Sequence, residues 1–322
     1  MKVITCFSYK GGAGRTTAAA NIAAALASMV ENVGSIERPL RRKVAIVDLD
    51  VFSAGTHRLF GISNPHLEQF TASGKPCVQD YLRDQMAPSS YVQQGGIKLD
   101  DPFMKEFRME RGADDNCHPD FTLFPARPDP DTKFAVQKQH ENVLIELLME
   151  LESGSRRFDY VILDGESGTR QMADIALRLS DVVLMFFRLT WQHIEGTLNT
   201  ANDFLNRPSR KDFYLIPTCV PPVEKAAKIY QNDAPGLQQL LKDTVRIPDA
   251  ARLNDFAEKH REKSGYFWAE QDSGKRMCIH DSLYLKGEER VLVFEGRGAE
   301  DPAAKDCYEI AVELDQRYGP SS

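Results

Sequence analysis

The residues best suited to chemistry lie in one short segment near the start of the chain. Residues 10–17 are Lys10, Gly11, Gly12, Ala13, Gly14, Arg15, Thr16 and Thr17. Glycines let a backbone bend around phosphate groups with its N–H groups pointing inward, and a helix that begins there adds the positive end of its dipole. The hydroxyl of Thr16 can bind Mg²⁺, and that of Thr17 can reach an inner phosphate. The segment therefore predicts a phosphate-binding loop.

This segment departs twice from the usual pattern G-x-x-x-x-G-K-[ST]. Tyr9 stands where the first glycine is expected, and Arg15 stands where the lysine is expected. Arginine is always charged and contacts phosphate through a planar fork, so nucleotide binding is expected to survive while hydrolysis is slow. A plain glycine-rich turn is the alternative. It is disfavoured because the flanking strand, the flanking helix, the basic residues and the paired threonines are all features of a phosphate-binding loop.

Carboxylates follow two further apolar runs. Asp48 and Asp50 end the run KVAIVDLD, and Asp164 ends the run FDYVILD. Two carboxylates at positions i and i+2 project to the same side where a strand leaves a sheet, and a carboxylate at a strand end can hold Mg²⁺ through water. A solvated strand end is the alternative, but the phosphate loop favours function. Glu166 in the following turn is a second candidate for polarising water, although an exposed loop glutamate is the commoner situation.

Alternating strand and helix patterns position these groups. Apolar runs predict strands at 2–8, 43–50, 121–126, 158–164, 181–187 and 212–220, and helical spacing predicts helices at 16–30, 133–152, 170–179, 191–206 and 302–317. This alternation favours an α/β fold with a doubly wound, mostly parallel sheet flanked by helices. We expect one domain over 1–322 with a loop at 31–42, an insertion at 61–119 holding one or two short helices, and a smaller insertion at 263–300.

Composition excludes several classes of protein. The six cysteines are scattered without a C-x-x-C pair, which argues against a disulfide framework and against zinc or iron–sulfur sites. The net charge of −7 disfavours a wholly basic nucleic-acid binder. No apolar run approaches the ~20 residues of a membrane span, and no export signal is present, so we expect a cytoplasmic protein. Local basic patches stay candidates for DNA contact: Arg38, Arg41, Arg42 and Lys43, and Arg207, Arg210 and Lys211.

Residues 10–17 resemble the deviant Walker A motif of the ParA/MinD family of dimeric P-loop ATPases. The resemblance covers most of the chain and extends to the segments LIPTCVPP and RIPDAARL. It implies a Mg²⁺–ATP-dependent, dimerising ATPase switch with slow hydrolysis that regulates a partner protein or assembly. With arginine in the loop, the sequence is similar to a ParA-like branch found in bacterial multi-component and defence systems.

The resemblance also implies a role for each site residue. Lys10 would reach across a homodimer to the partner's nucleotide, and Asp50 would orient the attacking water. The residues implied as catalytic are Lys10, Asp50 and Arg15. The residues implied for binding ATP are Gly11, Gly12, Ala13, Gly14, Arg15, Thr16, Thr17, Thr218 and Pro248. The residues implied for Mg²⁺ are Thr16, Asp48 and Asp164.

Two alternative functions stay open. Arg15 and the unusual turn GESG after Asp164 favour an ATP-binding sensor with little hydrolysis in a defence or signalling system. A ParA-type ATPase that partitions DNA or plasmids would instead bind DNA non-specifically through surface lysines and arginines. Other relatives of the family are disfavoured. No cysteine lies between Cys117 and Cys219, which argues against a nitrogenase-type iron protein with a cluster at its dimer interface, and the [NT]-K-x-D pattern that recognises guanine in GTPases is absent. The ending DQRYGPSS has too little apolar face to insert into a membrane as membrane-associated relatives do.

Overall fold

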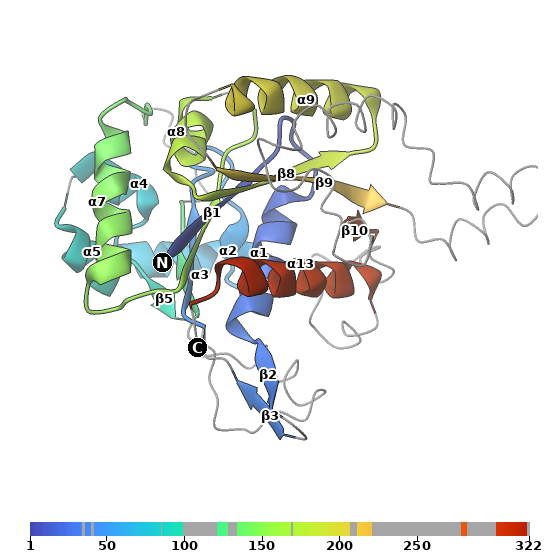
Figure 1. Ribbon diagram of the computed structural model, residues 1–322. Coiled ribbons are helices and arrows are strands. Elements are labelled where there is room, and N and C mark those ends of the chain that lie inside the picture. The colour runs from blue at the N-terminus through green and yellow to red at the C-terminus, as the bar shows by residue number, and fades with distance from the viewer. Residues whose placement is uncertain are drawn as a thin grey trace, which may run out of the picture.

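The computed structural model describes residues 1–33, 36–39, 42–84, 86–98, 121–127, 134–168, 170–206, 211–220, 278–281 and 301–320. An eight-stranded sheet lies at the centre of this part of the chain, in the order β10-β9-β8-β1-β7-β4-β6-β5 (Figure 1). Its strands are β1 (Lys2–Phe7), β4 (Val44–Asp48), β5 (Ile97–Lys98), β6 (Phe121–Phe124), β7 (Tyr160–Asp164), β8 (Val182–Arg188), β9 (Asp212–Val220) and β10 (Ile279–His280). Neighbours pair in parallel except β5 with β6, which confirms the predicted mostly parallel sheet.

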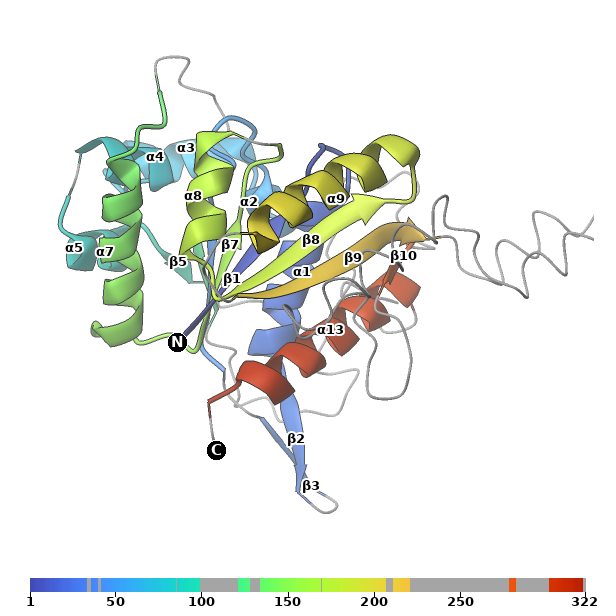
Figure 2. The same ribbon diagram turned by 45° about the horizontal axis from the view of Figure 1, so that its top comes forward.

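Helices cover both faces of the sheet, as Figure 2 shows. On one face lie α1 (Arg15–Ala27) and α13 (Pro302–Tyr318), and on the other lie α7 (His140–Ser153), α8 (Gln171–Leu179) and α9 (Trp191–Leu205). Side chains alternate along each strand, so Ile46 faces α1 while its neighbour Val47 faces the other layer. Seven of the thirteen residues of α1 are alanines, which lets this helix lie close to the sheet while α13 covers its outer side.

The region expected as an insertion is more helical than predicted. After α2 (Thr56–Leu59), the chain forms α3 (Asn64–Ala72), α4 (Val78–Asp84) and α5 (Pro88–Gln94), three helices rather than one or two, within the described part of 61–119. The Tyr81 and Tyr91 rings stack with centroids 4.4 Å apart, and Tyr91 lies 5.5 Å from Phe124 of β6. Helices α4 and α5 complete the core on one side of the sheet, because Tyr81 and Tyr91 are fully buried there.

Two local expectations were wrong. The loop expected at 31–42 is an antiparallel hairpin of β2 (Val30–Val33) and β3 (Ile36–Pro39), in which Val30 pairs with Pro39. Backbone pairing between two short segments does not need an apolar run, so a search for such runs misses it. The helix expected from residue 133 begins at His140, whose Nδ1 accepts a hydrogen bond from the N–H of Gln137 and holds a turn before the helix.

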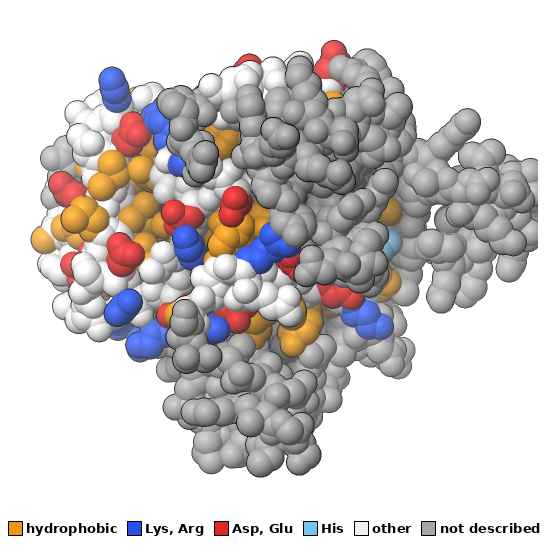
Figure 3. All heavy atoms as spheres, viewed as in Figure 1, with side chains coloured by type: hydrophobic (Ala, Val, Ile, Leu, Met, Phe, Trp, Pro, Cys, Tyr) orange, Lys and Arg blue, Asp and Glu red, His pale blue; other side chains and the backbone are white. Residues whose placement is uncertain are grey.

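Little of the second expected insertion is described. Within 263–300, the structure describes residues 278–281, which include β10 at the edge of the sheet, and the rest of this range lies outside the described residues. On the opposite side of the molecule, α7 exposes Met149, with 61% of its surface accessible, and Ile145. Figure 3 shows apolar side chains over this helix. No helix among the described residues has the length and apolar character needed to cross a membrane.

Candidate functional site

The predicted phosphate loop joins β1 to α1, and its backbone has a conformation that requires glycine at two positions. Gly12 and Gly14 have φ angles of 76° and 71°, in the left-handed region that other residues rarely adopt. No atom lies within 4 Å of the place where a Cβ would stand on either glycine. Gly14 is the N-cap of α1, and no side chain caps this helix. The first N–H groups of α1 therefore face the loop and suit an anion.

Contacts from strand β9 and helix α9 hold the loop in place. The Thr218 hydroxyl at the end of β9 donates to the carbonyl oxygen of Ala13 at 2.7 Å. The ring of Tyr9 packs against Gly196 of α9 so closely that a Cβ on Gly196 would overlap it. Tyr9 therefore occupies the first glycine position of the usual pattern because its ring has a place against α9. The structure shows Thr218 supporting the loop backbone, and its contact with ATP stays a prediction.

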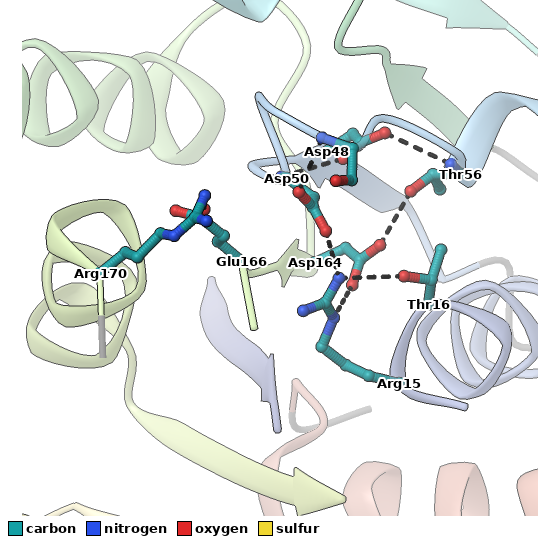
Figure 4. Close-up of polar contacts among 9 residues, drawn as sticks. Arg15, Thr16, Asp48, Asp50, Thr56, Asp164, Glu166 and Arg170 are labelled. Atoms are coloured by element: carbon teal, nitrogen blue, oxygen red, sulfur yellow. Dashed lines mark hydrogen bonds and ion pairs between the residues drawn. The ribbon is translucent and has the colours of Figure 1, made fainter. Parts of the chain in front are cut away.

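Arg15 is turned toward carboxylates (Figure 4). Its Nε donates to Asp164 Oδ1 at 2.8 Å, and its Nη2 donates to Asp50 Oδ2 at 2.8 Å and to the Thr16 hydroxyl at 3.2 Å. Burial works against the charged guanidinium, but Asp164 and then Asp50 outweigh it and raise the pKa of Arg15 above its ordinary value. The phosphate contact expected for Arg15 stays a prediction, and it requires this side chain to leave both carboxylates.

Neighbouring strands bring the carboxylates together. Asp48 and Asp164 are register partners at the ends of β4 and β7. Asp48 accepts hydrogen bonds from the N–H of Asp50 at 3.1 Å and from the N–H of Thr56 at 3.3 Å. Burial, followed by repulsion from Asp164 and Asp50, raises the pKa of Asp48 to about 7. The sequence analysis missed Thr56, whose hydroxyl donates to Asp164 Oδ2 at 2.9 Å; a threonine at the first turn after a D-x-D strand end was the available signal.

The oxygen atoms of this cluster suit a hard cation. Thr16, Asp50 and Asp164 already converge on one positive charge, the guanidinium of Arg15, and oxygen donors of this kind are the ones that Mg²⁺ prefers. Among the described residues, no three His, Cys, Asp or Glu side chains form a closed metal site. Mg²⁺ at nucleotide sites takes one or two carboxylates plus substrate phosphates. The donors therefore fit Mg²⁺ once Arg15, whose Nη1 is buried without a hydrogen-bond partner, has moved.

Glu166 is buried, so the expectation of an exposed loop residue was wrong. It is 3% exposed, and its Oε1 pairs with Arg170 Nη1 at 2.5 Å. The guanidinium of Arg170 also lies 5.4 Å from the centre of the Phe52 ring, in the loop that follows Asp50. Burial raises the pKa of Glu166, and Arg170 opposes this shift. Asp50 and Arg15 also act on the pKa of Glu166, so Glu166 lies near the cluster of Arg15, Asp48, Asp50 and Asp164.

The remaining predicted residues lie on the surface or outside the described part. Lys10 is exposed, and its Nζ donates to Gln192 Oε1 of the same chain at 2.7 Å. In the basic patches, Arg42 makes two hydrogen bonds to Asp315, at 2.7 and 3.0 Å, and Lys211 donates to the carbonyl oxygen of Leu177 at 3.1 Å. Both cations therefore serve internal contacts. Outside the described residues lie Pro248, Arg207 and Arg210, together with the side chains of Arg38 and Arg41.

Comparison with known proteins adds a family and a fold. A family model described as AAA domain matches residues 1–211. The MinD cell division protein of Aquifex aeolicus is 16% identical, with a TM-score of 0.60 over 100% of this chain and 99% of that chain. A putative plasmid partition protein of Borrelia burgdorferi B31 bound to AMPPNP is 17% identical, with a TM-score of 0.56 over 98% of each chain.

A third similar structure contains a nucleotide and a metal. The septum site-determining protein MinD of Pyrococcus horikoshii OT3, complexed with Mg-ADP, is 15% identical, with a TM-score of 0.53 over 99% of this chain and 97% of that chain. No curated protein matches the chain. At these identities the structural likeness concerns the fold, and it confirms the doubly wound α/β architecture expected from the sequence.

Proposed function

The chain belongs to the AAA-domain family, and on that basis we propose that it is a Mg²⁺–ATP-dependent ATPase that acts as a dimerising switch. The observation that carries this proposal is the open loop with left-handed Gly12 and Gly14, placed beside Asp50 and Asp164. A phosphate site next to carboxylates that suit Mg²⁺ is what phosphoryl transfer to water requires. Related structures that hold AMPPNP and Mg-ADP support the choice of nucleotide and metal.

We propose the following division of labour within the site. The loop 11–17 binds the phosphates, with Thr218 and Pro248 on the side of the base. Thr16 and Asp164 hold Mg²⁺, and Asp48 lies next to them. When bound, Mg²⁺ neutralises charge on the phosphate oxygens. Arg15 moves from Asp50 and Asp164 to the phosphates, and because two buried ion pairs must break for this, we expect hydrolysis to be slow.

Lys10 is proposed to act across the interface of a homodimer. It is exposed at the start of the loop, and its hydrogen bond to Gln192 is a surface contact. Surface contacts of this kind contribute little free energy, so the phosphates of a partner's nucleotide can compete for the ammonium group. The output of the switch is a change in affinity for a partner protein in the cytoplasm, because ATP stabilises one quaternary state.

Light scattering tests the switch directly. Solution mass is measured without nucleotide, with Mg²⁺–ADP and with Mg²⁺–ATP, for the wild type, Lys10→Ala and Lys305→Ala, a matched exposed lysine on α13. We expect ATP to double the mass of the wild type and of Lys305→Ala, and to leave Lys10→Ala monomeric while it still binds nucleotide. A mass that never responds to nucleotide, or a Lys10→Ala variant that dimerises normally, would contradict the proposal.

A second candidate function, a nucleotide sensor that hardly hydrolyses ATP, is favoured by one observation. Both carboxylate oxygens of Asp50 are engaged, Oδ1 by the N–H of Ser53 at 3.0 Å and Oδ2 by Arg15. If Arg15 stays on Asp50 after nucleotide binds, the proposed water-orienting carboxylate is occupied. Stoichiometric ATP binding with no turnover above that of Asp50→Ala would support the sensor, whereas turnover that Asp50→Ala abolishes would support the enzyme.

A further inference from the structure

A turn after β7 lies directly against the residues that lead into the phosphate loop. The N–H of Gly165 donates to the carbonyl oxygen of Cys6 at 3.1 Å, and the N–H of Gly168 donates to the carbonyl oxygen of Ser8 at 3.0 Å. Both acceptors belong to the end of β1 or the residue after it. The turn 165–168 is therefore fixed beside the loop at both of its ends.

Glu166 stands in this turn and has one oxygen without a partner. Its Oε1 pairs with Arg170, whereas Oε2 is buried and has no hydrogen-bond partner among the described residues. A buried carboxylate oxygen without a donor is costly unless a water or a ligand completes it. By contrast, both oxygens of Asp50 accept hydrogen bonds, one of them from the charged guanidinium of Arg15. Glu166 is thus the better acceptor for a further donor.

We infer that Glu166 orients the attacking water and that Arg170 holds Glu166 in position, an inference that rests on the proposed ATPase function. The water oxygen forms a bond to the γ-phosphorus of ATP. The bond from that phosphorus to the bridging oxygen breaks, and its electron pair passes to ADP. Both water hydrogens leave with the inorganic phosphate as H₂PO₄⁻, so the Glu166 carboxylate ends as it began. Asp50 then holds Arg15 before the nucleotide binds, rather than acting on the water itself.

Arg170 is the positioning residue in this arrangement. Arg170 is the N-cap of α8, and its guanidinium pairs with Glu166, four residues earlier in the chain. The same guanidinium lies over the Phe52 ring in the loop after β4. Figure 4 shows Glu166 and Arg170 beside the cluster around Arg15. Arg170 therefore links the turn after β7 to the loop that carries Asp50. It engages Oε1 of Glu166, which leaves Oε2 as the oxygen available to water.

The test compares steady-state ATP turnover with nucleotide binding in one set of variants. Glu166→Gln keeps the shape of the side chain and removes the charge, and Glu68→Gln, an exposed glutamate on α3, is its matched control. Binding is measured with a fluorescent ATP analogue and Mg²⁺, which also reports that each variant is folded. We expect Glu166→Gln to bind as the wild type does and to lose turnover by about 100-fold or more, the usual contribution of a side chain that orients a reacting water.

Arg170 variants separate positioning from mere structural support. Arg170→Ala is expected to lower kcat about 10-fold with KM unchanged, and Arg170→Lys, which keeps the charge, is expected to recover most of the loss. Wild-type turnover in Glu166→Gln overturns the inference alone. A wild type that binds ATP without any turnover overturns the proposed ATPase as well. A loss in Arg170→Ala that Arg170→Lys does not rescue refutes the positioning role.

Discussion

Replacement of Arg15 by alanine is the perturbation that the cluster responds to most strongly. The change removes the cation shared by Asp50 and Asp164, of which Asp164 is fully buried. Asp48, whose pKa is raised by burial and then by repulsion from Asp164 and Asp50, stays beside them. Breaking a buried ion pair by removing one partner costs about 3–5 kcal/mol because a buried charge is left uncompensated. For a chain of this size we expect Tm to fall by about 4–7 °C without nucleotide.

Mg²⁺ distinguishes this explanation from a loss of packing. Once Arg15 is gone, the oxygens of Thr16, Asp50 and Asp164 can accept a metal ion without nucleotide. At tenfold excess over its Kd, Mg²⁺ would return about 1.4 kcal/mol of stability to the variant. In the wild type the guanidinium holds the same oxygens, so we expect no such gain. Arg15→Lys keeps the positive charge but lacks the planar guanidinium, so its stability and its response to Mg²⁺ are expected to lie between those of the wild type and Arg15→Ala.

Urea denaturation with and without MgCl₂, at constant ionic strength, measures both effects. The control salt is NaCl, because general screening would stabilise or destabilise every variant alike. The reasoning is refuted if Arg15→Ala unfolds at the urea concentration of the wild type and ignores Mg²⁺. It is also refuted if Mg²⁺ stabilises the wild type as much as the variant, since the guanidinium would then not occupy the donors.

Three further predictions follow from contacts outside this cluster. Gly196→Ala forces a methyl group into the Tyr9 ring, so we expect a loss of about 1–3 kcal/mol in urea denaturation together with weaker ATP binding; unchanged ATP affinity would show that the ring does not hold the loop. Asp315→Ala leaves the guanidinium of Arg42 without its two hydrogen bonds and should cost about 1.5–3 kcal/mol in the same assay; an effect below 0.5 kcal/mol would contradict a stabilising pair. A hydrogen bond to a carboxylate raises the pKa of His280 to about 10, so its contribution to stability is complete below about pH 6.5 and is lost as the pH rises through 10; the stability difference between wild type and His280→Gln, followed from pH 6 to pH 10, should shrink.

The elements that the sequence predicted well are those with an apolar run of their own. The strand at 212–220 has the predicted bounds because the apolar run from Phe213 to Pro217, which is buried on both faces, is a clear signal by itself. The hairpin from Val30 to Pro39 was missed because its strands are polar and are specified by pairing with each other. The helices between 61 and 98 were underestimated because short helices carry too few turns for a clear period.

For the site, the residue types were predictable and their partners were not. The spacing of glycines, threonines and aspartates located the cluster, since the carboxyl ends of parallel strands meet at one edge of the sheet. That Arg15 contacts Asp50 and Asp164 depends on β4 and β7 being neighbours, which the chain order does not reveal. The same adjacency explains why Thr56 and Arg170 were overlooked and why Glu166, in a turn that looked exposed, is buried.

The cover that α13 provides for α1 has a consequence for the order in which the chain can mature. The helix that starts at the phosphate loop is synthesised before the helix near residue 310, which packs against its outer side. At about 5–20 residues per second, roughly 15–60 seconds of synthesis separate the two. During that interval the outer side of α1 has no cover, so the nascent chain is expected to depend on holding chaperones and to gain nucleotide affinity only after α13 has been made.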